Sequence, residues 1–379
     1  MTVGLQNKRT EYMKKTPFRM LILSAGMLFL LVWLINSSTS AKEATASTRG
    51  FYKNISKGRD FNYLIIGDSI GRGSGVGHKD ETWFALFEEE IRRDYGSNGK
   101  RYSIVQSGAT SFEGIVKYDN EKPRFPVDLV FIVFGENDRK YMDARQFSFL
   151  YEQLLRKVKT DHPNADIITF TESCLTYESF ADTIRKVSGH YEAMNIDMRV
   201  PFKNSGLDTD KLTRDLIHPN KIGYELYAGE IAKSIKATVQ SGKKAAPMPA
   251  PINRGLSREY KKIGEPSNQS GFVKSGKNFF SREKGSFIEY EFKGTMIGYT
   301  VERGPEGGEV DVVIDGKKVD TVSTWWPFKR ERHIFLAGSL GEGPHRIRFV
   351  HTGEIAIQGS QVLKPSFRIK AIIAEKGTP

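Results

Sequence analysis

Between residues 61 and 238, short apolar runs alternate with longer segments whose apolar residues recur at helical spacing. The runs of strand length are FNYLIIG from residue 61, YSIVQSG from 102, VDLVFIVFG from 127, ADIITF from 165 and NIDMRV from 195. Strands that alternate with helices favour a parallel sheet, because each helix carries the chain back across the sheet. The pattern therefore predicts an α/β domain with a mostly parallel sheet and helices on both faces.

The sequence after residue 239 has a different texture, and a chain of 379 residues is long enough for two domains. Residues 240–257 are rich in Pro, Ala, Gly and Lys and lack apolar periodicity, which is typical of an interdomain linker. Residues 258–379 contain short alternating runs split by glycine turns, including a hairpin signal at Asp315-Gly316. They are predicted to form an all-β sandwich. The α/β domain is assigned to residues 59–239.

An uncharged, almost wholly apolar run, MLILSAGMLFLLVWLI, lies near the N-terminus and is preceded by five basic residues. We expect a single-pass transmembrane anchor at residues 20–36, with residues 1–19 as a basic cytoplasmic tail. Residues 37–58 then form a spacer. A cleaved signal peptide is the alternative, because small residues that a signal peptidase accepts follow at 37–41. In both cases the remainder of the chain is expected outside the cytoplasm.

This expected location decides how charge and cysteine content are interpreted. The chain has 57 Lys and Arg against 45 Asp and Glu, a formal net charge of +12. Outside the membrane, anionic wall polymers or lipid headgroups are more plausible partners than nucleic acid, which is not expected to bind. The one cysteine, Cys174, cannot form an intramolecular disulfide, so stability must come from packing.

A serine follows the first predicted strand directly, in the stretch YLIIGDSIGRGSGV. Ligands of open parallel sheets gather at the carboxyl ends of the strands, which is where Ser69 is expected. Serine is a weak nucleophile without a base within hydrogen-bond reach. His218 in RDLIHPNK is the candidate base, and Asp215 three residues earlier is the candidate carboxylate that orients it. Taken alone, this Asp/His pair would more often be an ordinary surface hydrogen bond.

Acyl transfer from an ester also requires donors for the oxyanion that forms in the transition state. Gly108 in IVQSGAT and Asn137 in FIVFGEND follow the second and third predicted strands, and each can supply an N–H group. The backbone N–H of Ser69 is the third candidate donor. Considered singly, Gly108 is simply a turn glycine and Asn137 a helix cap. Their occurrence at successive strand ends favours an oxyanion hole.

These residues together resemble the SGNH (GDSL-type) serine hydrolase family. The resemblance covers residues 61–238, with GDSI, QSGAT, GEND and DLIH in the order of the family's four blocks. It implies a flavodoxin-like three-layer fold and a catalytic triad of Ser69, Asp215 and His218. It also implies an oxyanion hole formed by Ser69, Gly108 and Asn137. Gln106 departs from the pattern, since many members have asparagine two places before the second-block glycine.

The β-rich segment resembles the jelly-roll modules that accompany SGNH domains in polysaccharide acetylesterases. A candidate glycan-binding platform for sugar rings and anionic groups lies in TWWPFKRERH and consists of Trp325, Trp326, Phe328 and Arg330. The alternative is that these aromatic residues pack in the sandwich core or between the domains.

The whole organisation resembles membrane-anchored O-acetyltransferases of Gram-positive cell-wall polysaccharides. The expected function is O-acetyl transfer to a cell-wall glycan through an acetyl-serine, with a multispanning membrane O-acyltransferase as the partner that supplies the acyl group. The alternatives are a carbohydrate acetylesterase with water as acceptor, a lipase or lysophospholipase, and a non-catalytic tethered protein that binds wall glycan. No cofactor is expected. No metal site is expected either, because the histidines lack ligand spacing.

Overall fold

The computed structural model describes residues 50–241, 247–256, 259–355 and 364–376. The predicted tail at 1–19, the predicted anchor at 20–36 and most of the predicted spacer lie outside these residues. Within the residues described, no helix combines the length and the apolar character needed to cross a bilayer.

The first lobe is built on a parallel sheet, as the alternating pattern predicted. Its described strands are β1 (Phe61–Gly67), β2 (Gly99–Val105), β3 (Leu129–Val133), β4 (Asp166–Thr171) and β5 (Met194–Asp197). They lie in the order β2-β1-β3-β4-β5, and every pair is parallel. This is the flavodoxin-like strand order, in which β1 and β3 meet at the point where the winding reverses.

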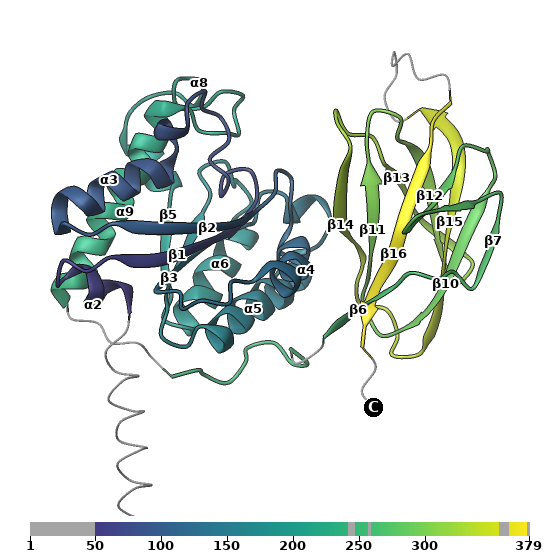
Figure 1. Ribbon diagram of the computed structural model, residues 1–379, viewed down its shortest axis with the longest axis horizontal. Helices are drawn as coiled ribbons and strands as arrows, with labels where there is room; N and C mark the ends of the chain where they lie inside the picture. Colours follow the sequence, from purple (N-terminus) through teal and green to yellow (C-terminus); the bar gives the residue numbers. More distant parts are fainter. Residues whose placement is uncertain (1–49, 242–246, 257–258, 356–363, 377–379) are drawn as a thin grey trace, which may run out of the picture. The chain divides into compact units, whose positions relative to one another are not determined.

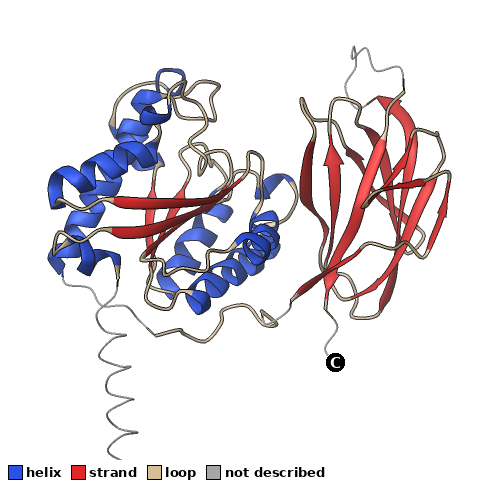
Figure 2. Cartoon of the chain, in the orientation of Figure 1, coloured by secondary structure: helices blue, strands red, loops and turns tan. Residues whose placement is uncertain are grey.

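Helices cover both faces of this sheet (Figures 1 and 2). On one face pack α2 (Phe51–Ile55), α3 (Trp83–Tyr95) and α9 (Lys221–Ser241), and on the other α4 (Ser111–Glu121), α5 (Ala144–Asp161) and α6 (Glu178–His190). Shorter helices are η1 (Lys79–Glu81), η2 (Asp138–Lys140), α7 (Arg199–Asn204) and α8 (Thr209–Leu212).

The two cores follow from the period of two along each strand. Tyr63 and Ile65 of β1 pack with Trp83 in one core, whereas Leu64 and Ile66 pack in the other. The strands are therefore buried on both sides, and a three-layer lobe results.

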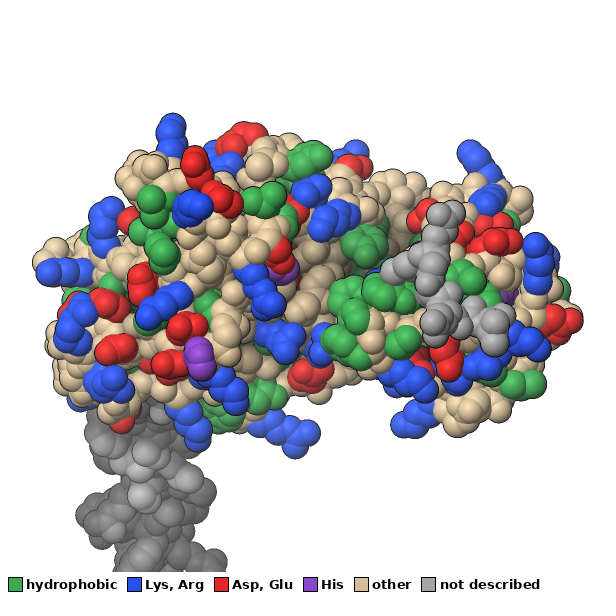
Figure 3. All heavy atoms as spheres, turned by 90° about the horizontal axis from the view of Figure 1, so that it is seen from above, with side chains coloured by type: hydrophobic (Ala, Val, Ile, Leu, Met, Phe, Trp, Pro, Cys, Tyr) green, Lys and Arg blue, Asp and Glu red, His purple; other side chains and the backbone are tan. Residues whose placement is uncertain are grey.

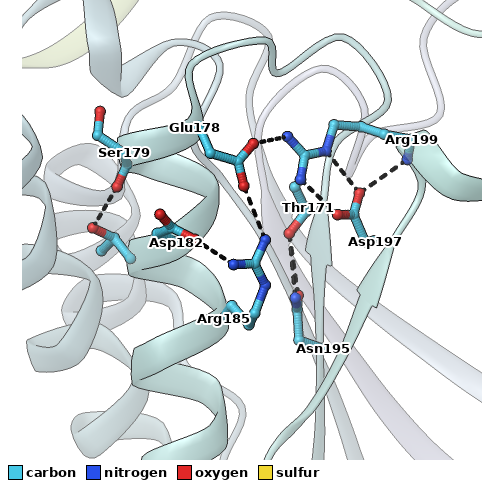
Figure 4. Close-up of polar contacts among 9 residues, drawn as sticks. Thr171, Glu178, Ser179, Asp182, Arg185, Asn195, Asp197 and Arg199 are labelled. Carbon is cyan, nitrogen blue, oxygen red and sulfur yellow. Dashed lines mark hydrogen bonds and ion pairs between the residues drawn. The ribbon is translucent and has the colours of Figure 1, made fainter.

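The fifth strand is shorter than the predicted run NIDMRV. β5 ends at Asp197 because the Asp197 carboxylate accepts the backbone N–H of Arg199 at 3.1 Å, in a turn that begins α7. Arg199 also pairs with Asp197 and with Glu178 of α6, at 2.6 Å and 2.7 Å (Figure 4). These ion pairs connect the end of β5 to α6.

Residues 247–256 belong to the segment predicted as a linker, and they lie against α5 without regular secondary structure. The buried carboxylate of Glu152 accepts the backbone N–H groups of Ile252 and Asn253 at 2.7 Å and 2.8 Å. Arg156 donates to the carbonyl of Pro249 at 2.8 Å. This part of the linker is thus held on the first lobe by hydrogen bonds.

The second lobe is all-β, as predicted, and its described strands form two antiparallel sheets. One sheet has the order β13-β12-β15-β10-β7, and the other has the order β14-β11-β16-β9-β8 with β6 paired to β16. The strands are β6 (Tyr260–Ile263), β7 (Asn268–Ser270), β8 (Val273–Ser275), β9 (Asn278–Ser281), β10 (Phe287–Lys293), β11 (Ile297–Arg303), β12 (Gly308–Ile314), β13 (Lys317–Ser323), β14 (Arg330–Ala337), β15 (Pro344–Ile355) and β16 (Phe367–Glu375).

The predicted hairpin is present between β12 and β13. Asp315 and Gly316 form its turn with φ angles of 51° and 80°, as a type I′ turn requires. The two sheets enclose an apolar core that includes Tyr290, Tyr299 and Phe349.

The second lobe contacts the first through α4. Phe112 of α4 packs edge-on against Tyr260 and Phe335, with ring centroids 5.6 Å and 5.8 Å apart. A Cβ atom added to Gly298 of β11 would lie 2.5 Å from the Phe112 ring, so the close approach requires glycine there. This contact concerns the site directly, because α4 follows the loop that contains Gly108.

Candidate active site

Ser69 lies in a tight turn immediately after β1, and its exposed fraction is only 6%. The turn is closed by a hydrogen bond from the Ser74 N–H to the Ser69 carbonyl at 2.9 Å. The indole N–H of Trp83 donates to the Ile70 carbonyl at 2.8 Å, which ties the turn to α3. The serine is therefore held at the carboxyl end of a central strand.

His218 and Asp215 reach Ser69 from the loop that precedes α9. His218 Nε2 lies 2.9 Å from Ser69 Oγ, and His218 Nδ1 lies 2.7 Å from Asp215 Oδ2. Partial burial of Asp215 opposes its ionisation, but hydrogen bonds from the His218 backbone and ring outweigh it and lower the pKa of Asp215. The structure thus joins all three residues of the predicted triad in one chain of hydrogen bonds.

The same loop is shaped by Asp215 and by a glycine from the serine turn. Asp215 Oδ1 accepts the backbone N–H of His218 at 2.8 Å, so this carboxylate holds both the backbone and the ring of the histidine. Gly75 has a φ of +116°, and an added Cβ would lie 2.2 Å from the Pro219 carbonyl oxygen and 3.0 Å from His218 Cβ. A side chain at residue 75 would push His218 away from Ser69.

The three predicted oxyanion donors lie at the carboxyl ends of the neighbouring strands β1, β2 and β3. Gly108 has a φ of +75°, which favours glycine. In the part of the chain that the structure describes, neither the Ser69 nor the Gly108 N–H donates a hydrogen bond to another protein group. The Asn137 amide donates one N–H to Asp68 Oδ2 at 2.7 Å and keeps its second N–H for another acceptor. Their catalytic role remains a prediction.

A buried pair of carboxyl groups, which the sequence did not reveal, lies behind Asn137. Asp68 accepts from Asn137 and from the backbone N–H of Ile70 at 2.8 Å. Glu172, just after β4, accepts the backbone N–H of Glu136 at 2.8 Å, and its charge is coupled electrostatically to that of Asp68. Burial raises the pKa of both carboxyl groups, and it raises that of Glu172 well above its usual value. The donors that Asp68 receives stabilise its ionised form and oppose the rise in its pKa.

Asp138, next to Asn137, is also fully buried. It accepts from the backbone and the hydroxyl of Ser111, at 2.8 Å and 2.5 Å, and so joins the end of β3 to the start of α4. Burial raises the pKa of Asp138 to about 7, although the hydrogen bonds from Ser111 oppose this shift.

Another buried carboxylate, Glu113 of α4, lies behind Gly108 and is paired across the two lobes. Arg332 of β14 binds Glu113 with its Nε and Nη2 atoms, the closest contact being 2.7 Å, and both side chains are almost fully buried. Arg332 Nη2 also donates to the Gly108 carbonyl at 2.7 Å. The all-β lobe therefore helps to orient the loop that contains a proposed oxyanion donor.

Gln106 takes part in the same network. Its side-chain amide donates to Glu113 at 3.1 Å and to the Glu331 carbonyl at 3.3 Å. This residue departs from the asparagine that many SGNH proteins have, and the longer side chain reaches the all-β lobe.

The predicted glycan-binding residues lie between β13 and β14 and at the start of β14. Trp326 approaches the site, since a Cβ atom added to Gly108 would be 3.7 Å from Trp326 Cη2. Phe328 is 49% exposed, and the Arg330 guanidinium lies 5.0 Å from the centre of its ring. Trp325 is half-buried, and its backbone pairs with Gly304 in an isolated parallel β-bridge. Thus Trp326, of the four, is brought against the oxyanion loop.

Comparison with known proteins is consistent with this geometry. A family model described as the GDSL-like Lipase/Acylhydrolase family matches residues 65–226. This match covers most of the α/β lobe, and the resemblance to SGNH proteins made from the sequence blocks is confirmed. No curated protein matches the sequence.

Solved structures resemble the chain over both lobes. A two-domain esterase active on acetylated mannans, co-crystallised with mannopentaose, is 17% identical with a TM-score of 0.66, and the match covers 88% of this chain and 97% of that chain. A second structure of a two-domain esterase active on acetylated mannans is 16% identical with a TM-score of 0.66 and coverages of 90% and 95%. At this identity the likeness concerns the fold, an α/β lobe followed by an all-β lobe.

Proposed function

We propose that the protein is a serine enzyme that acts on O-acetyl esters of a polysaccharide, with Ser69 as the nucleophile. The observation that carries this proposal is the chain of hydrogen bonds from Ser69 to His218 and on to Asp215, at 2.9 Å and 2.7 Å. It lies at the same edge of the sheet as Gly108 and Asn137. An imidazole placed between a hydroxyl and a carboxylate is the arrangement that activates serine for attack on an ester.

In the first half-reaction, Ser69 Oγ attacks the acetyl carbonyl carbon while His218 Nε2 takes the hydroxyl proton. Asp215 stabilises the imidazolium that forms. The N–H groups of Ser69 and Gly108, together with the Asn137 amide, donate to the oxyanion of the tetrahedral intermediate. The C–O bond of the ester then breaks, the alcohol leaves with the proton from His218, and acetyl-Ser69 remains.

In the second half-reaction, an acceptor hydroxyl gives its proton to His218 and attacks acetyl-Ser69. The free serine returns when His218 passes that proton back to Ser69 Oγ. If the acceptor is a sugar hydroxyl the enzyme is an O-acetyltransferase, and if it is water the enzyme is an acetylesterase.

In its finer form, we propose O-acetyl transfer to a cell-wall polysaccharide outside the cytoplasm. The basic residues followed by an apolar run at 20–36 support a membrane anchor, which would place the enzyme beside a multispanning O-acyltransferase that donates the acetyl group. The residues Trp325, Trp326, Phe328 and Arg330 are the proposed contacts of the glycan.

The acetylesterase is the second candidate, and a specific observation favours it. The side chains of His218 and Asp215 are 27% and 49% exposed, so water has access to the base. The fold is also that of two-domain esterases active on acetylated mannans.

Turnover of p-nitrophenyl acetate by the full-length protein tests the common chemistry. Replacement Ser69→Ala should lower kcat by a factor of about 10⁴ or more, since the nucleophile is lost. Ser74→Ala in the same turn is the matched control, because the contact that Ser74 makes to Tyr224 uses its backbone carbonyl. Mass spectrometry should find one acetyl group on Ser69. Equal turnover by wild type and Ser69→Ala would refute the proposal.

Incubation with an acetyl donor and purified wall glycans separates the two candidates. Acetylated sugar in the products identifies the transferase, whereas release of acetate alone identifies the esterase.

A further inference from the structure

A cluster of arginines lies beside the proposed oxyanion loop, and most of it has no counter-charge. Its members come from both lobes: Arg72 from the serine turn, and Arg303, Arg330 and Arg332 from the all-β lobe. Arg332 is paired with Glu113 at 2.7 Å. Among the described residues, the other three arginines form no ion pair.

Printed contacts connect this cluster to the site. Arg72 Nη1 donates to Ser107 Oγ at 3.2 Å, which places its guanidinium beside the residue that precedes Gly108. The guanidinium carbons of Arg303 and Arg332 lie 5.2 Å and 5.5 Å from the centre of the Trp326 ring. Trp326 itself reaches Gly108. The cluster therefore extends from the turn of the nucleophile to the edge of the second lobe.

Arg330 lies within the electrostatic reach of other cations. Burial, followed by the positive charges of Arg72 and Arg332, lowers the pKa of Arg330, and Glu113 opposes this shift. Glu113 already accepts hydrogen bonds from Arg332, Gln106 and the backbone of His333. The negative charge of Glu113 is therefore balanced by Arg332 at the contact between the lobes. The positive charges of Arg330 and Arg72 are not neutralised by it and create a positive potential at the surface.

Three N–H donors in the cluster are buried and lack a partner in the described part of the chain. They are Arg303 Nε, Trp326 Nε1 and Arg330 Nη1. Buried donors are normally satisfied, and an unsatisfied one is costly. The three residues themselves are only half-buried, so these groups lie near the surface of the protein. Hydrophobic side chains and Lys and Arg side chains lie close together on the face in Figure 3.

We propose that Arg72, Arg330 and the neighbouring Arg303 and Trp326 form a subsite for an anionic group of the glycan, a carboxylate or a phosphate on a sugar near the acetylated one. This inference rests on the proposed function and specifies its substrate class. An anionic group has several acceptor oxygens, which match guanidinium and indole donors, and its charge removes the repulsion among the arginines. A neutral glycan such as a mannan would leave this charge uncompensated.

Binding of unacetylated hexasaccharides to the full-length protein by isothermal titration calorimetry tests the subsite. The three probes are an oligogalacturonate, a phosphorylated mannan oligosaccharide and the same mannan oligosaccharide without phosphate. At least one anionic probe should bind about tenfold more tightly than the neutral one, and the preferred one identifies the anion. Arg330→Met and Arg72→Met should each abolish most of this preference.

Lys317→Met is the matched control, since it removes one positive charge from an exposed strand of the same lobe and should keep the preference. Equal binding of all three probes, or a preference that survives in Arg330→Met, would overturn the proposal. Turnover of p-nitrophenyl acetate is measured on the same preparations. If turnover does not depend on Ser69, the proposed function is refuted but the subsite is not, because the binding ratios test the subsite independently.

Discussion

Two fully buried glutamates lie behind the proposed oxyanion hole, and their charges are balanced in different ways. Glu172, behind Asn137, lies beside Asp68 inside the α/β lobe, and burial raises its pKa well above the usual value, which favours its neutral form. Glu113, behind Gly108, is balanced by the guanidinium of Arg332 from the all-β lobe. One donor of the proposed oxyanion hole therefore adjoins buried carboxyl groups with raised pKa values, and the other depends on the second lobe.

This difference determines whether a change of pH or the removal of a side chain alters the stability of each glutamate's surroundings. A carboxyl group that stays protonated only because it is buried becomes less favourable as the pH rises. A carboxylate paired with arginine is insensitive to pH near neutrality, because the guanidinium remains charged. Such a pair instead becomes destabilising when the cation is removed, since an uncompensated buried charge is left.

The largest effect is expected for Arg332→Met, which removes the cation and leaves Glu113 buried and alone. Breaking a buried pair in this way costs about 3–5 kcal/mol, so the midpoint of thermal unfolding should fall by roughly 10 °C. Turnover of p-nitrophenyl acetate should fall as well, because the Gly108 carbonyl loses its donor. Differential scanning calorimetry and steady-state kinetics measure the two effects.

A double variant separates the two roles of Arg332. Glu113→Gln combined with Arg332→Met has no buried charge, so most of the thermal stability should return while turnover stays low. An unchanged unfolding midpoint in Arg332→Met would show that the pair contributes no net stability to the contact between the lobes.

A smaller effect, confined to the pH dependence, is expected for Glu172→Gln. The folded pKa of Glu172 is raised above the unfolded value of 4.5, so its stabilising contribution is complete below that pH and is lost as the pH rises toward the folded value. Each such group reduces the stability of the wild type by about 1.4 kcal/mol per pH unit in that window. Glutamine has a similar size and does not titrate. Urea unfolding between pH 5 and 8 should therefore show a shallower decline for the variant.

Glu225→Gln is the control for this pH series, since Glu225 is an exposed residue of α9 and should follow the wild-type curve. Asp138, whose pKa is raised to about 7 by burial, continues to titrate in Glu172→Gln and should preserve part of the decline. Parallel curves for wild type and Glu172→Gln would mean that Glu172 is already ionised in the folded protein.

The sequence was sufficient to predict which residues meet at the site, because the strand order brings them together. Ser69, Gly108 and Asn137 each follow an apolar run, and the carboxyl ends of β1, β2 and β3 are adjacent in a parallel sheet. His218 and Asp215 were recognised from their spacing and their place before α9. These predictions needed only local patterns and the topology of the fold.

The buried clusters could not be predicted, because their partners are distant in sequence. Glu113 on a helix with polar neighbours is typical of an exposed residue, and its partner Arg332 is 219 positions away. Glu172 resembles any acidic residue at a strand end, and the rise in its pKa depends on burial that only the packed structure creates. The predicted end of the fifth strand was wrong for a similar reason, the turn made by Asp197 and Arg199.

The smallest effect is expected for Gln106→Asn, which introduces the residue that many SGNH proteins have. The shorter side chain cannot span the 3.1 Å bond to Glu113 and the 3.3 Å bond to the Glu331 carbonyl, while Arg332 and the His333 N–H continue to hold Glu113. Loss of such hydrogen bonds costs about 1 kcal/mol, so the unfolding midpoint should fall by about 2–4 °C and turnover by a few-fold at most. A loss as large as that of Arg332→Met would show that Gln106, rather than the arginine, is the main partner that stabilises Glu113 against the all-β lobe.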